Sequence, residues 1–281
     1  MNDVHGNGHT RVANVSKAYR PKGAAPTQVL ANCSFDIEPG RLTVMMGASG
    51  TGKSTVAYLL AGYEKPDEGT IELDGQSVSG PAPERIMVFQ ETALWPWMTV
   101  MKNLTFGPLS RGDMSRSVAQ ERAEELLERF GLSAFRDRYP GHLSGGMKRR
   151  AEIAQALMNQ PKLMILDEPF RGLDEMTREL MQEYYVKLFE ENRLTTLFIT
   201  SELEEAIFLG DRIMILGDAP SRVVKVIEVS LPHPRTFELM ETQEYLEIKA
   251  EAMEQLYAYS SQVTKTGPLA LGTDFDKSGC V

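Results

Sequence analysis

The stretch GASGTGKST, residues 47–55, constrains the fold of this chain more than any other. It matches the phosphate-loop pattern G-x-x-x-x-G-K-[ST], follows an apolar strand-like segment at 42–46 and precedes a helix-like segment at 55–61. Glycines let the backbone curl so that successive N–H groups point at phosphate oxygens, and the helix N-terminus adds its dipole. The context therefore predicts a strand, a nucleotide-binding loop and a helix rather than an ordinary glycine turn.

We expect the residues of this loop to share the contacts to a nucleotide. The lysine of such a loop, here Lys53, reaches the β- and γ-phosphates, and the hydroxyl of Ser54 binds Mg²⁺. The other residues are expected to contact the phosphates: Gly47, Ala48, Ser49, Gly50, Thr51, Gly52 and Thr55. ATP and Mg²⁺ are therefore the predicted cofactors.

A second chemical signal is LMILDEP at 163–169, an apolar run that ends in two carboxylates. A strand that ends here places Asp167 beside the phosphate loop, where enzymes of this type hold Mg²⁺. A carboxylate directly after it, here Glu168, is able to act as a general base by polarising a water for attack on the γ-phosphate. Without the phosphate loop the same pair is an ordinary surface turn, so the metal interpretation depends on the loop.

The rest of the chain alternates between strand and helix patterns. Strand-like segments are expected at 41–46, 71–73, 85–89, 163–166, 196–200, 212–216 and 223–229. Between Phe89 and Leu163 the pattern is helical, and Gly131 is a C-cap after an apolar stripe at 119, 123, 126, 127 and 130. The chain is therefore predicted to be an α/β sheet with a helical insertion at about 92–158.

The two ends of the chain carry weaker patterns. Residues 1–10 are polar, show no periodicity and are predicted to be disordered. Beyond LPHPR at 231–235, one amphipathic helix is expected at about 237–259, followed by a flexible tail. The predicted organisation is a nucleotide-binding domain at 11–231 and an appended segment at 232–281. The appended helix is either a regulatory element or a cover for the sheet.

Composition narrows the function classes. The net charge of −9 lacks the basic excess of a nucleic-acid-binding protein, so no nucleic-acid partner is expected. The cysteines, Cys33 and Cys280, are far apart and form no disulfide framework, which suits a reducing compartment. No apolar run approaches the ~20 residues that span a bilayer, so a role at a membrane requires a partner.

A second glycine motif, LSGGM at 143–147, leads into a helix-like run and also has the form of a phosphate cradle. In chain order, the phosphate loop, Gln90 after RIMVF, LSGGM, LMILDE and GLD at 172–174 resemble the nucleotide-binding subunit of an ABC transporter over about 11–231. The resemblance implies an α/β P-loop NTPase (ABC ATPase) core with a parallel-rich sheet, an antiparallel N-terminal β subdomain and an inserted helical subdomain.

The resemblance also implies a role for the second glycine motif. In that family the signature serine and glycines contact the γ-phosphate of ATP that the other subunit holds, which implies this role for Ser144, Gly145 and Gly146. A second ATP-binding subunit is therefore an expected partner, and both a homodimer and a pair of similar chains stay open. Asp174 is implied to communicate across the dimer with the other site.

Two further roles follow from matching positions. Tyr19, in VSKAY, is implied to stack on adenine, and its alternative is an ordinary strand residue. Gln90 is implied to sense Mg²⁺ and the attacking water, which makes it both a metal-site and a catalytic candidate. The same residue is implied to link ATP to the membrane subunit.

Finer details resemble one group within the family, the importer ATPases for nitrate, sulfonate and taurine. They are GPAPERIMVFQETALWPWMTVMKN at 80–103, Met147 in the signature and VSLPHPR at 229–235. This implies uptake of a small solute through a separate integral-membrane permease, with a periplasmic or extracellular solute-binding protein as an indirect partner. The chain is then peripheral, at the cytoplasmic face of the inner membrane. The solute is selected by those other subunits.

The sequence departs from the family where hydrolysis is concerned. A family histidine that contacts the γ-phosphate follows the strand at 196–200, and Ser201 stands in its place here. The helix after the signature also differs, with Arg149, Glu152 and Gln155 where the family usually has Gln, Ala and Arg. Ser201 is therefore a catalytic candidate whose efficiency stays open. The alternative function is a degenerate subunit that binds ATP but hydrolyses it slowly.

Several other interpretations compete with these. A soluble ABC ATPase of repair or translation usually carries long insertions or paired cassettes, and this single compact cassette counts against that class. A P-loop kinase is excluded in practice because its chemistry does not need LSGGM. Trp95 and Trp97 are either core of the helical insertion or the rim of a groove for a membrane-subunit helix. The basic run at 148–150 is predicted to be a solvated helix turn. His142 and His233 show no metal-ligand spacing, and His233 lies too late in the chain to replace the missing histidine.

Overall fold

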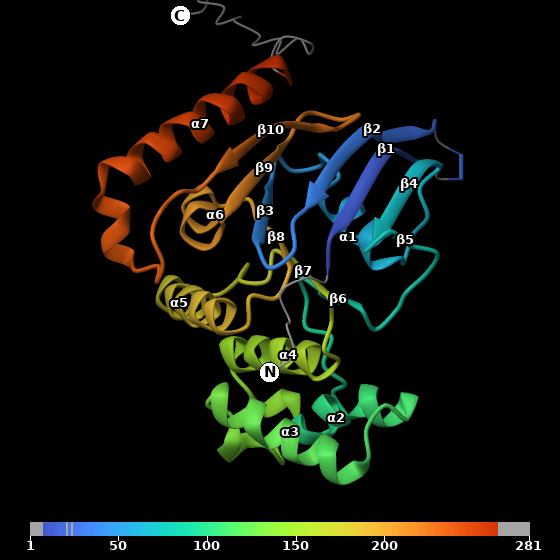
Figure 1. Cartoon of the computed structure of the whole chain (residues 1–281), viewed down its shortest axis with the longest axis vertical. Helices are drawn as coiled ribbons and strands as arrows, with labels where there is room; N and C mark the ends of the chain where they lie inside the picture. The colour runs from blue at the N-terminus through green and yellow to red at the C-terminus, as the bar shows by residue number, and fades with distance from the viewer. Residues whose placement is uncertain (1–7, 21, 24, 264–281) are drawn as a thin grey trace, which may run out of the picture.

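The computed structural model describes residues 8–20, 22–23 and 25–263, with side chains up to residue 258. In this part of the chain it has two β-sheets, a group of helices inserted between two strands of the larger sheet, and further helices that cover that sheet (Figure 1). The inserted helices form the lower end of the molecule in Figure 1, and the smaller sheet lies at the upper right.

The larger sheet has the strand order β10-β9-β3-β8-β7-β6. Neighbouring strands are parallel except β10, which pairs antiparallel with β9 at one edge. The strands are β3 (Leu42–Met46), β6 (Arg85–Val88), β7 (Leu163–Asp167), β8 (Thr196–Ile199), β9 (Arg212–Leu216) and β10 (Val223–Glu228). Each overlaps a segment that the sequence predicted as a strand, and apolar residues dominate most of them because both faces of a parallel sheet are covered.

Side chains on the two faces of this sheet enter separate cores. In β3, Val44 and Met46 pack with the helices on one face, whereas Met45 packs toward the smaller sheet on the other. In β7, Leu166 and Ile165 divide between the faces in the same way. This alternation follows the two-residue period of a strand. The strand ends therefore stand at the edge of a layer that is held from both sides, and the functional loops begin there.

The smaller sheet is antiparallel, with the order β2-β1-β4-β5. Its strands are β1 (Thr10–Tyr19), β2 (Thr27–Ile37), β4 (Glu68–Leu73) and β5 (Gln76–Ser77). Helix α1 (Lys53–Ala61) shares one apolar core with both sheets, so it joins them. The sequence indicated this N-terminal sheet through the family resemblance, but its pattern did not locate β1 and β2 individually.

The inserted helices follow β6 and precede β7. They are α2 (Val100–Arg111), α3 (Arg116–Arg129) and α4 (Gly145–Met158), with short 3₁₀ turns at Ser133–Phe135 and Pro140–His142. Each α-helix begins after a residue whose hydroxyl accepts a backbone N–H of the first turn: Thr99, Ser115 and Ser144. Helix α4 lies between the sheet and the other two helices (Figure 1). The predicted fold class, including its helical subdomain, is confirmed.

The remaining helices cover the larger sheet. They are α5 (Glu175–Asn192), α6 (Leu203–Leu209), a 3₁₀ turn at Phe237–Glu241 and α7 (Gln243–Val263). Helix α7 packs against α6 and β10, and the ring of Phe237 stacks on Phe208 with centroids 4.5 Å apart. The appended helix therefore covers α6 and the edge strand β10 of the larger sheet. Within the described residues, no helix combines the length and apolarity that crossing a bilayer requires.

The prediction of disorder for residues 1–10 is wrong for its last three positions. Thr10 is the buried first residue of β1. The backbone N–H groups of Gly8 and His9 both donate to Asp74 Oδ1, at 2.8 and 3.0 Å. The local composition is polar, but the partner lies in a distant part of the chain, so the local pattern missed it. Residues 1–7 and 264–281, with the predicted tail, lie outside the described residues.

Candidate functional site

The phosphate loop lies between β3 and α1, as the sequence predicts. Gly50 and Gly52 have φ angles of 83° and 89°, in the left-handed region that favours glycine. At Gly52 a Cβ atom would lie 2.5 Å from Val29 Cγ1 of the neighbouring sheet. At Gly50, apart from the two chain neighbours, no atom of the described residues lies within 4 Å of the corresponding point. The loop is therefore closed against the protein at one glycine and faces open space at the other, as a phosphate cradle requires.

Lys53 is the first residue of α1 and is buried beneath the loop. Its Nζ donates to the carbonyl oxygens of Gly47, at 2.8 Å, and Ala48, at 3.0 Å. Burial lowers the pKa of Lys53, and the carboxylates of Glu168 and Asp167 oppose that effect. The ammonium group is thus held beside the loop, next to acidic residues, where a phosphate anion would be neutralised.

Asp167 ends β7, and its buried carboxylate accepts a hydrogen bond from the Ser54 hydroxyl. Burial raises the pKa of Asp167, and the charge of Glu168 adds to the rise, while Ser54 and Lys53 lower it. Magnesium prefers oxygen ligands and is usually held by one or two protein groups together with substrate phosphates. The paired hydroxyl and carboxylate fit that need. No cluster of three or more His, Cys, Asp or Glu side chains in the described residues offers an independent metal site.

Glu168 follows with an unusual backbone conformation. Its φ is 43°, in the left-handed region, and its N–H donates to the carbonyl of Ile199 at 2.9 Å. Its side chain is 13% exposed, and Oε2 accepts from Arg171 Nη1 at 2.7 Å. A left-handed conformation in a residue other than glycine costs energy and is found more often at functional sites. The backbone here turns the candidate base out of the strand and into the space beside the loop.

A cleft of about 250 Å³ opens at this point. Ser49, Lys53 and Glu168 line it, together with Ser201, which follows β8. The structure therefore brings Ser49 of the phosphate loop, the ammonium group of Lys53, the candidate base Glu168 and Ser201 to one cleft. Arg171 also lines this cleft, although the sequence did not indicate it as a site residue. The signal available in the sequence was the position of this arginine, between the two carboxylates at 167–168 and GLD at 172–174.

Tyr19 lies outside that cleft, at the end of β1. Its hydroxyl donates to Glu64 Oε1 at 3.0 Å and lies 3.3 Å from Thr55 Oγ1, in the helix that follows the phosphate loop. Burial is the main cause that raises the pKa of Tyr19. The half-buried ring is thus fixed next to α1 by its hydroxyl, and its stacking on adenine stays a prediction.

The signature segment stands at the start of α4. Ser144 and Gly145 are exposed, and Ser144 caps the helix. A Cβ at Gly145 would lie 3.2 Å from Leu173 Cδ2, and one at Gly146 would lie 2.9 Å from Thr177 Cγ2. The glycines therefore let α4 approach the beginning of α5 closely. None of the three signature residues lines the cleft of this chain.

Asp174 is the exposed N-cap of α5. Its Oδ1 accepts the N–H of Thr177 at 3.0 Å and its Oδ2 accepts the hydroxyl of the same residue at 2.7 Å. These bonds, the side-chain one first, lower the pKa of Asp174. Capping of α5 is the role that Asp174 has within this chain, and its communication across a dimer stays a prediction.

Gln90 is exposed just beyond β6 and does not line the cleft. Its backbone oxygen accepts from Arg149 Nη2 at 2.6 Å. The prediction of a solvated turn at 148–150 is wrong for Arg149, which is buried and pairs with Glu152 at 2.9 Å. The helix pattern did not reveal this burial because the covering segment comes from a distant part of the chain.

Trp95 and Trp97 are surface residues, 39% and 65% exposed, with ring centroids 5.1 Å apart. Trp95 also meets Phe106 edge-on at 6.0 Å. Phe106 lines a cleft of about 220 Å³ together with Tyr63 and Phe89. The interpretation of these tryptophans as core residues is therefore wrong, and they lie beside a shallow aromatic groove.

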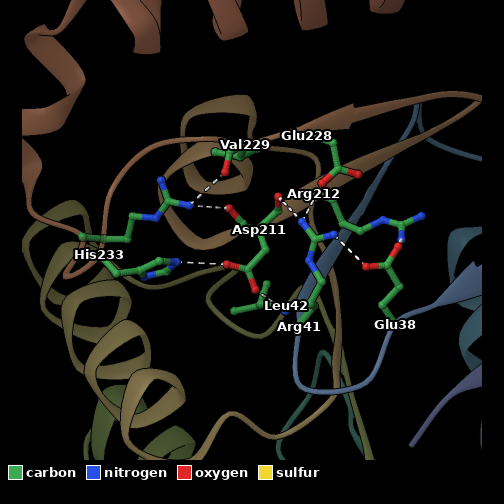
Figure 2. Close-up of polar contacts among 10 residues, drawn as sticks. Glu38, Arg41, Leu42, Asp211, Arg212, Glu228, Val229 and His233 are labelled. Atoms are coloured by element: carbon green, nitrogen blue, oxygen red, sulfur yellow. Dashed lines mark hydrogen bonds and ion pairs between the residues drawn. The ribbon is translucent and has the colours of Figure 1, made fainter.

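His233 serves a different site. Its Nε2 lies 3.0 Å from Asp211 Oδ1 (Figure 2), and its Nδ1 lies 2.8 Å from Glu190 Oε1. Asp211 Oδ2 also accepts the backbone N–H of Leu42 at 2.8 Å. This histidine thus ties the segment before α7 to the larger sheet, and it does not line the cleft at Ser201.

Comparison with known proteins gives one family. A family model described as "ABC transporter" matches residues 30–171. The chain is 36% identical over 256 residues to the nitrate import ATP-binding protein NrtD of Synechocystis sp., covering 91% of this chain and 94% of that protein. It is 37% identical over 241 residues to the aliphatic sulfonates import ATP-binding protein SsuB of Bacillus cereus, covering 86% and 93%.

A solved structure supports the same assignment. The dimeric ATP-binding cassette MJ0796 in a post-hydrolysis state, bound to ADP and Pi, is 30% identical, with a TM-score of 0.69 over 79% of this chain and 100% of that chain. Sequence, fold and the geometry of the phosphate loop therefore agree. This chain belongs to the ABC transporter family and is an ABC ATPase.

Proposed function

We propose that this chain is the ATP-hydrolysing subunit of an importer that takes up a small anionic solute of the nitrate, sulfonate or taurine kind. The observation that carries the proposal is the single cleft that joins Lys53, Glu168 and Ser201 at the phosphate loop. The solute class is supported by the relatives, whose names describe import of nitrate and of aliphatic sulfonates.

The residues of the site have distinct roles in this proposal. Hydrolysis of the γ-phosphoryl group of ATP would drive transport, and Mg²⁺ would supply neutralisation of the phosphate charge. Ser54 and Asp167 would hold the cation through oxygen atoms, and Gln90 is the further ligand proposed. Lys53 neutralises phosphate charge at the loop. Glu168 accepts a proton from the attacking water at a carboxylate oxygen.

The second glycine motif serves a second ATP-binding subunit. Ser144, Gly145 and Asp174 are exposed and lie outside the chain's own cleft, so they are available to another chain. The dimer of MJ0796 supports a pairing of two cassettes. We propose a homodimer, or a pair with a similar chain, in which each signature segment completes the other site.

The membrane partner is a permease that docks near the helical insertion. The exposed aromatic side chains of Trp95, Trp97 and Phe106 form an apolar rim suited to a helix of that partner. In this arrangement the chain is peripheral at the cytoplasmic face of the inner membrane, and a solute-binding protein acts on the other side. We propose that 11–231 is the nucleotide-binding domain and 232–281 an appendage.

The test is to purify this chain with its membrane partner and measure ATP turnover with and without solute-loaded binding protein. We expect turnover that rises when the loaded binding protein is added. Absence of any ATP turnover in the complete complex would contradict the role as motor. Turnover that does not respond to any anion of the proposed class would contradict the solute assignment alone.

A second function, a degenerate subunit that binds ATP but hydrolyses it slowly, is favoured by Ser201. Its hydroxyl is short and neutral, whereas an imidazole reaches further and is able to carry a positive charge. Removing one well-placed charge-stabilising donor costs ~10²–10³ in rate in other enzymes. Slow turnover with ordinary ATP affinity would support this alternative over the first.

A further inference from the structure

The segment that carries Gln90 is bound to α4 by two charged side chains. We name residues 89–93 the Gln90 segment. Arg149 donates through Nη1 to the carbonyl of Phe89 and through Nη2 to that of Gln90, both at 2.6 Å. Glu152 Oε1 accepts the N–H of the last residue of the segment, at 2.5 Å. Both ends of the Gln90 segment are therefore attached to one face of α4.

These two side chains also pair with each other inside the protein. Arg149 Nη1 lies 2.9 Å from Glu152 Oε2, and the side chains are only 8% and 4% exposed. Burial lowers the pKa of Arg149 and raises that of Glu152, and each charge opposes the effect on its partner. The two charges thus depend on each other and on the backbone groups of the Gln90 segment.

Such a pair is poorly explained as a source of stability alone. Removing two charges from water is costly, and apolar side chains of similar volume often stabilise a protein equally well or better. The use of a buried ion pair that is better attested is to specify one arrangement among alternatives. Here the specified arrangement is the position of the Gln90 segment on α4.

Helix α4 connects this attachment to the signature. The helix begins at Gly145, and Arg149 stands four residues later, which is about 6 Å along the axis. The exposed signature residues and the buried ion pair are therefore parts of one short rigid element.

We propose that Arg149 and Glu152 are positioning residues that make the Gln90 segment move with the signature helix. The inference rests on the proposed function, in which the signature contacts the partner's nucleotide and Gln90 contacts its own. Under it, engagement of the signature by one nucleotide sets the position of Gln90 at the other. Because coupling between sites is reciprocal, the state of Gln90 also alters how well the signature engages.

The pair is tested by removing both charges while keeping the volume. In the full chain carrying Glu168→Gln, the double variant Arg149→Met/Glu152→Leu is compared with the unmodified pair. Hydrogen–deuterium exchange is measured for peptides covering 89–98 and 143–147, with and without Mg·ATP. Fluorescence of Trp95 and Trp97, the two tryptophans of the chain, reports on the adjacent surface.

With the native pair, we expect Mg·ATP to slow exchange in both peptides, and the two sites to alter each other's nucleotide affinity by a factor in the ~5–150-fold range of typical allosteric coupling. In the double variant the dimer still forms and the signature peptide is still protected, but the response at 89–98 is lost. The matched control is Arg136→Met/Glu124→Leu, which removes an exposed ion pair of the same subdomain, 2.6 Å long, and keeps both responses.

Two outcomes overturn the inference, and they differ from failure of the proposed function. Undiminished protection of 89–98 in the double variant would show that the pair only stabilises the fold. If the native-pair protein itself showed no Mg·ATP-dependent dimer, the proposed function would fail first, and the inference with it.

A second variant covers the case in which the double variant does not fold. Glu152→Gln keeps the shape and an oxygen acceptor for the backbone N–H but removes the negative charge. We expect this variant to weaken the response at 89–98 while the response at the signature remains. An unchanged response at 89–98 would again overturn the inference.

Discussion

Glu168 and Arg171 form an ion pair in which Oε2 of the candidate base lies 2.7 Å from the guanidinium Nη1. The two partners differ in environment, because Glu168 is 13% exposed whereas Arg171 is 64% exposed. Ion pairs with an exposed partner are worth only ~0–1 kcal/mol, since solvent screens the charges and a long side chain must be ordered. The pair therefore orients the carboxylate without locking it.

From this weak pairing we predict a small effect of Arg171→Ala. A change of ~1 kcal/mol corresponds to about a fivefold change in rate, so ATP turnover of the complete transporter should stay within about fivefold of the native value. Steady-state turnover at saturating Mg·ATP measures this, with Arg171→Lys as the variant that keeps the charge. Loss of turnover in the alanine variant together with recovery in the lysine variant would mean that a positive charge at this position takes part in hydrolysis.

Glu168→Gln is expected to trap an ATP-bound dimer. The amide keeps the size of the side chain and leaves Lys53 and the loop unchanged, but it cannot accept the proton from water at neutral pH. Sizing of the variant with and without Mg·ATP, followed over time, checks this expectation. A variant that stayed monomeric at saturating Mg·ATP would contradict the model of two chains that share two sites.

Lys53→Ala is expected to abolish tight ATP binding and, with it, solute uptake. The ammonium group is buried between loop carbonyls and the acidic pair, and no other lysine lines the cleft in the described part of the chain. Binding of a fluorescent ATP analogue and uptake in cells that express only the variant are the measurements. Lys102→Ala, at an exposed position of α2, is the control and should leave both unchanged. Normal uptake with Lys53→Ala would be incompatible with a role as the motor.

Ser201→His is expected to raise turnover in the assembled complex. The exposed serine already lines the cleft beside Lys53 and Glu168, so an imidazole at this position has access to the same space. The gain should lie below the ~10²–10³ that one well-placed donor contributes in other enzymes. The native chain, Ser201→His and Glu168→Gln are compared at saturating Mg·ATP, and ATP affinity should change little. Fast native turnover that the histidine leaves unchanged would refute the degenerate-subunit alternative.

Asp211→Asn is expected to lower the free energy of unfolding at neutral pH. It is also expected to make that free energy fall less as the pH is lowered. Burial alone raises the pKa of Asp211, but the bonds from His233 and the Leu42 N–H outweigh it, so the net pKa lies below the ordinary value. A carboxylate with a lowered folded pKa stabilises the protein above its unfolded pKa, ~3.9, and this contribution is lost as the pH falls through the folded value.

The measurement for Asp211 is urea unfolding between about pH 7 and pH 3, a window chosen around the unfolded pKa. The loss at neutral pH should be about 1.5–3 kcal/mol, the typical value for a hydrogen bond to a charged group. Asp113→Asn, which removes an exposed partner of Arg111, is the control and should change stability little. An acid response of Asp211→Asn identical to that of the native chain would contradict the assignment.

Much of the site could be predicted from the sequence because its requirements are local. The turn at Gly50 and Gly52 needs φ angles that favour glycine, and the lysine and hydroxyl follow within two residues. A buried strand before the loop and a helix after it have periodicities that are visible in short windows. Asp167 and Glu168 likewise mark the end of an apolar strand. These features identify a nucleotide site without reference to any distant contact.

The tertiary structure decided the burial and pairing of residues whose neighbours lie far away in the sequence. Arg149 has the sequence context of a solvated basic turn, but it is buried because the Gln90 segment, about sixty positions earlier, lies across it. Thr10 begins a strand because β2 and β4 flank it. Burial and hydrogen bonding are set by whatever packs against a residue, and a local pattern does not contain that neighbour. For the same reason, only the folded chain shows that Arg171 and Ser201 meet Glu168 in one cleft.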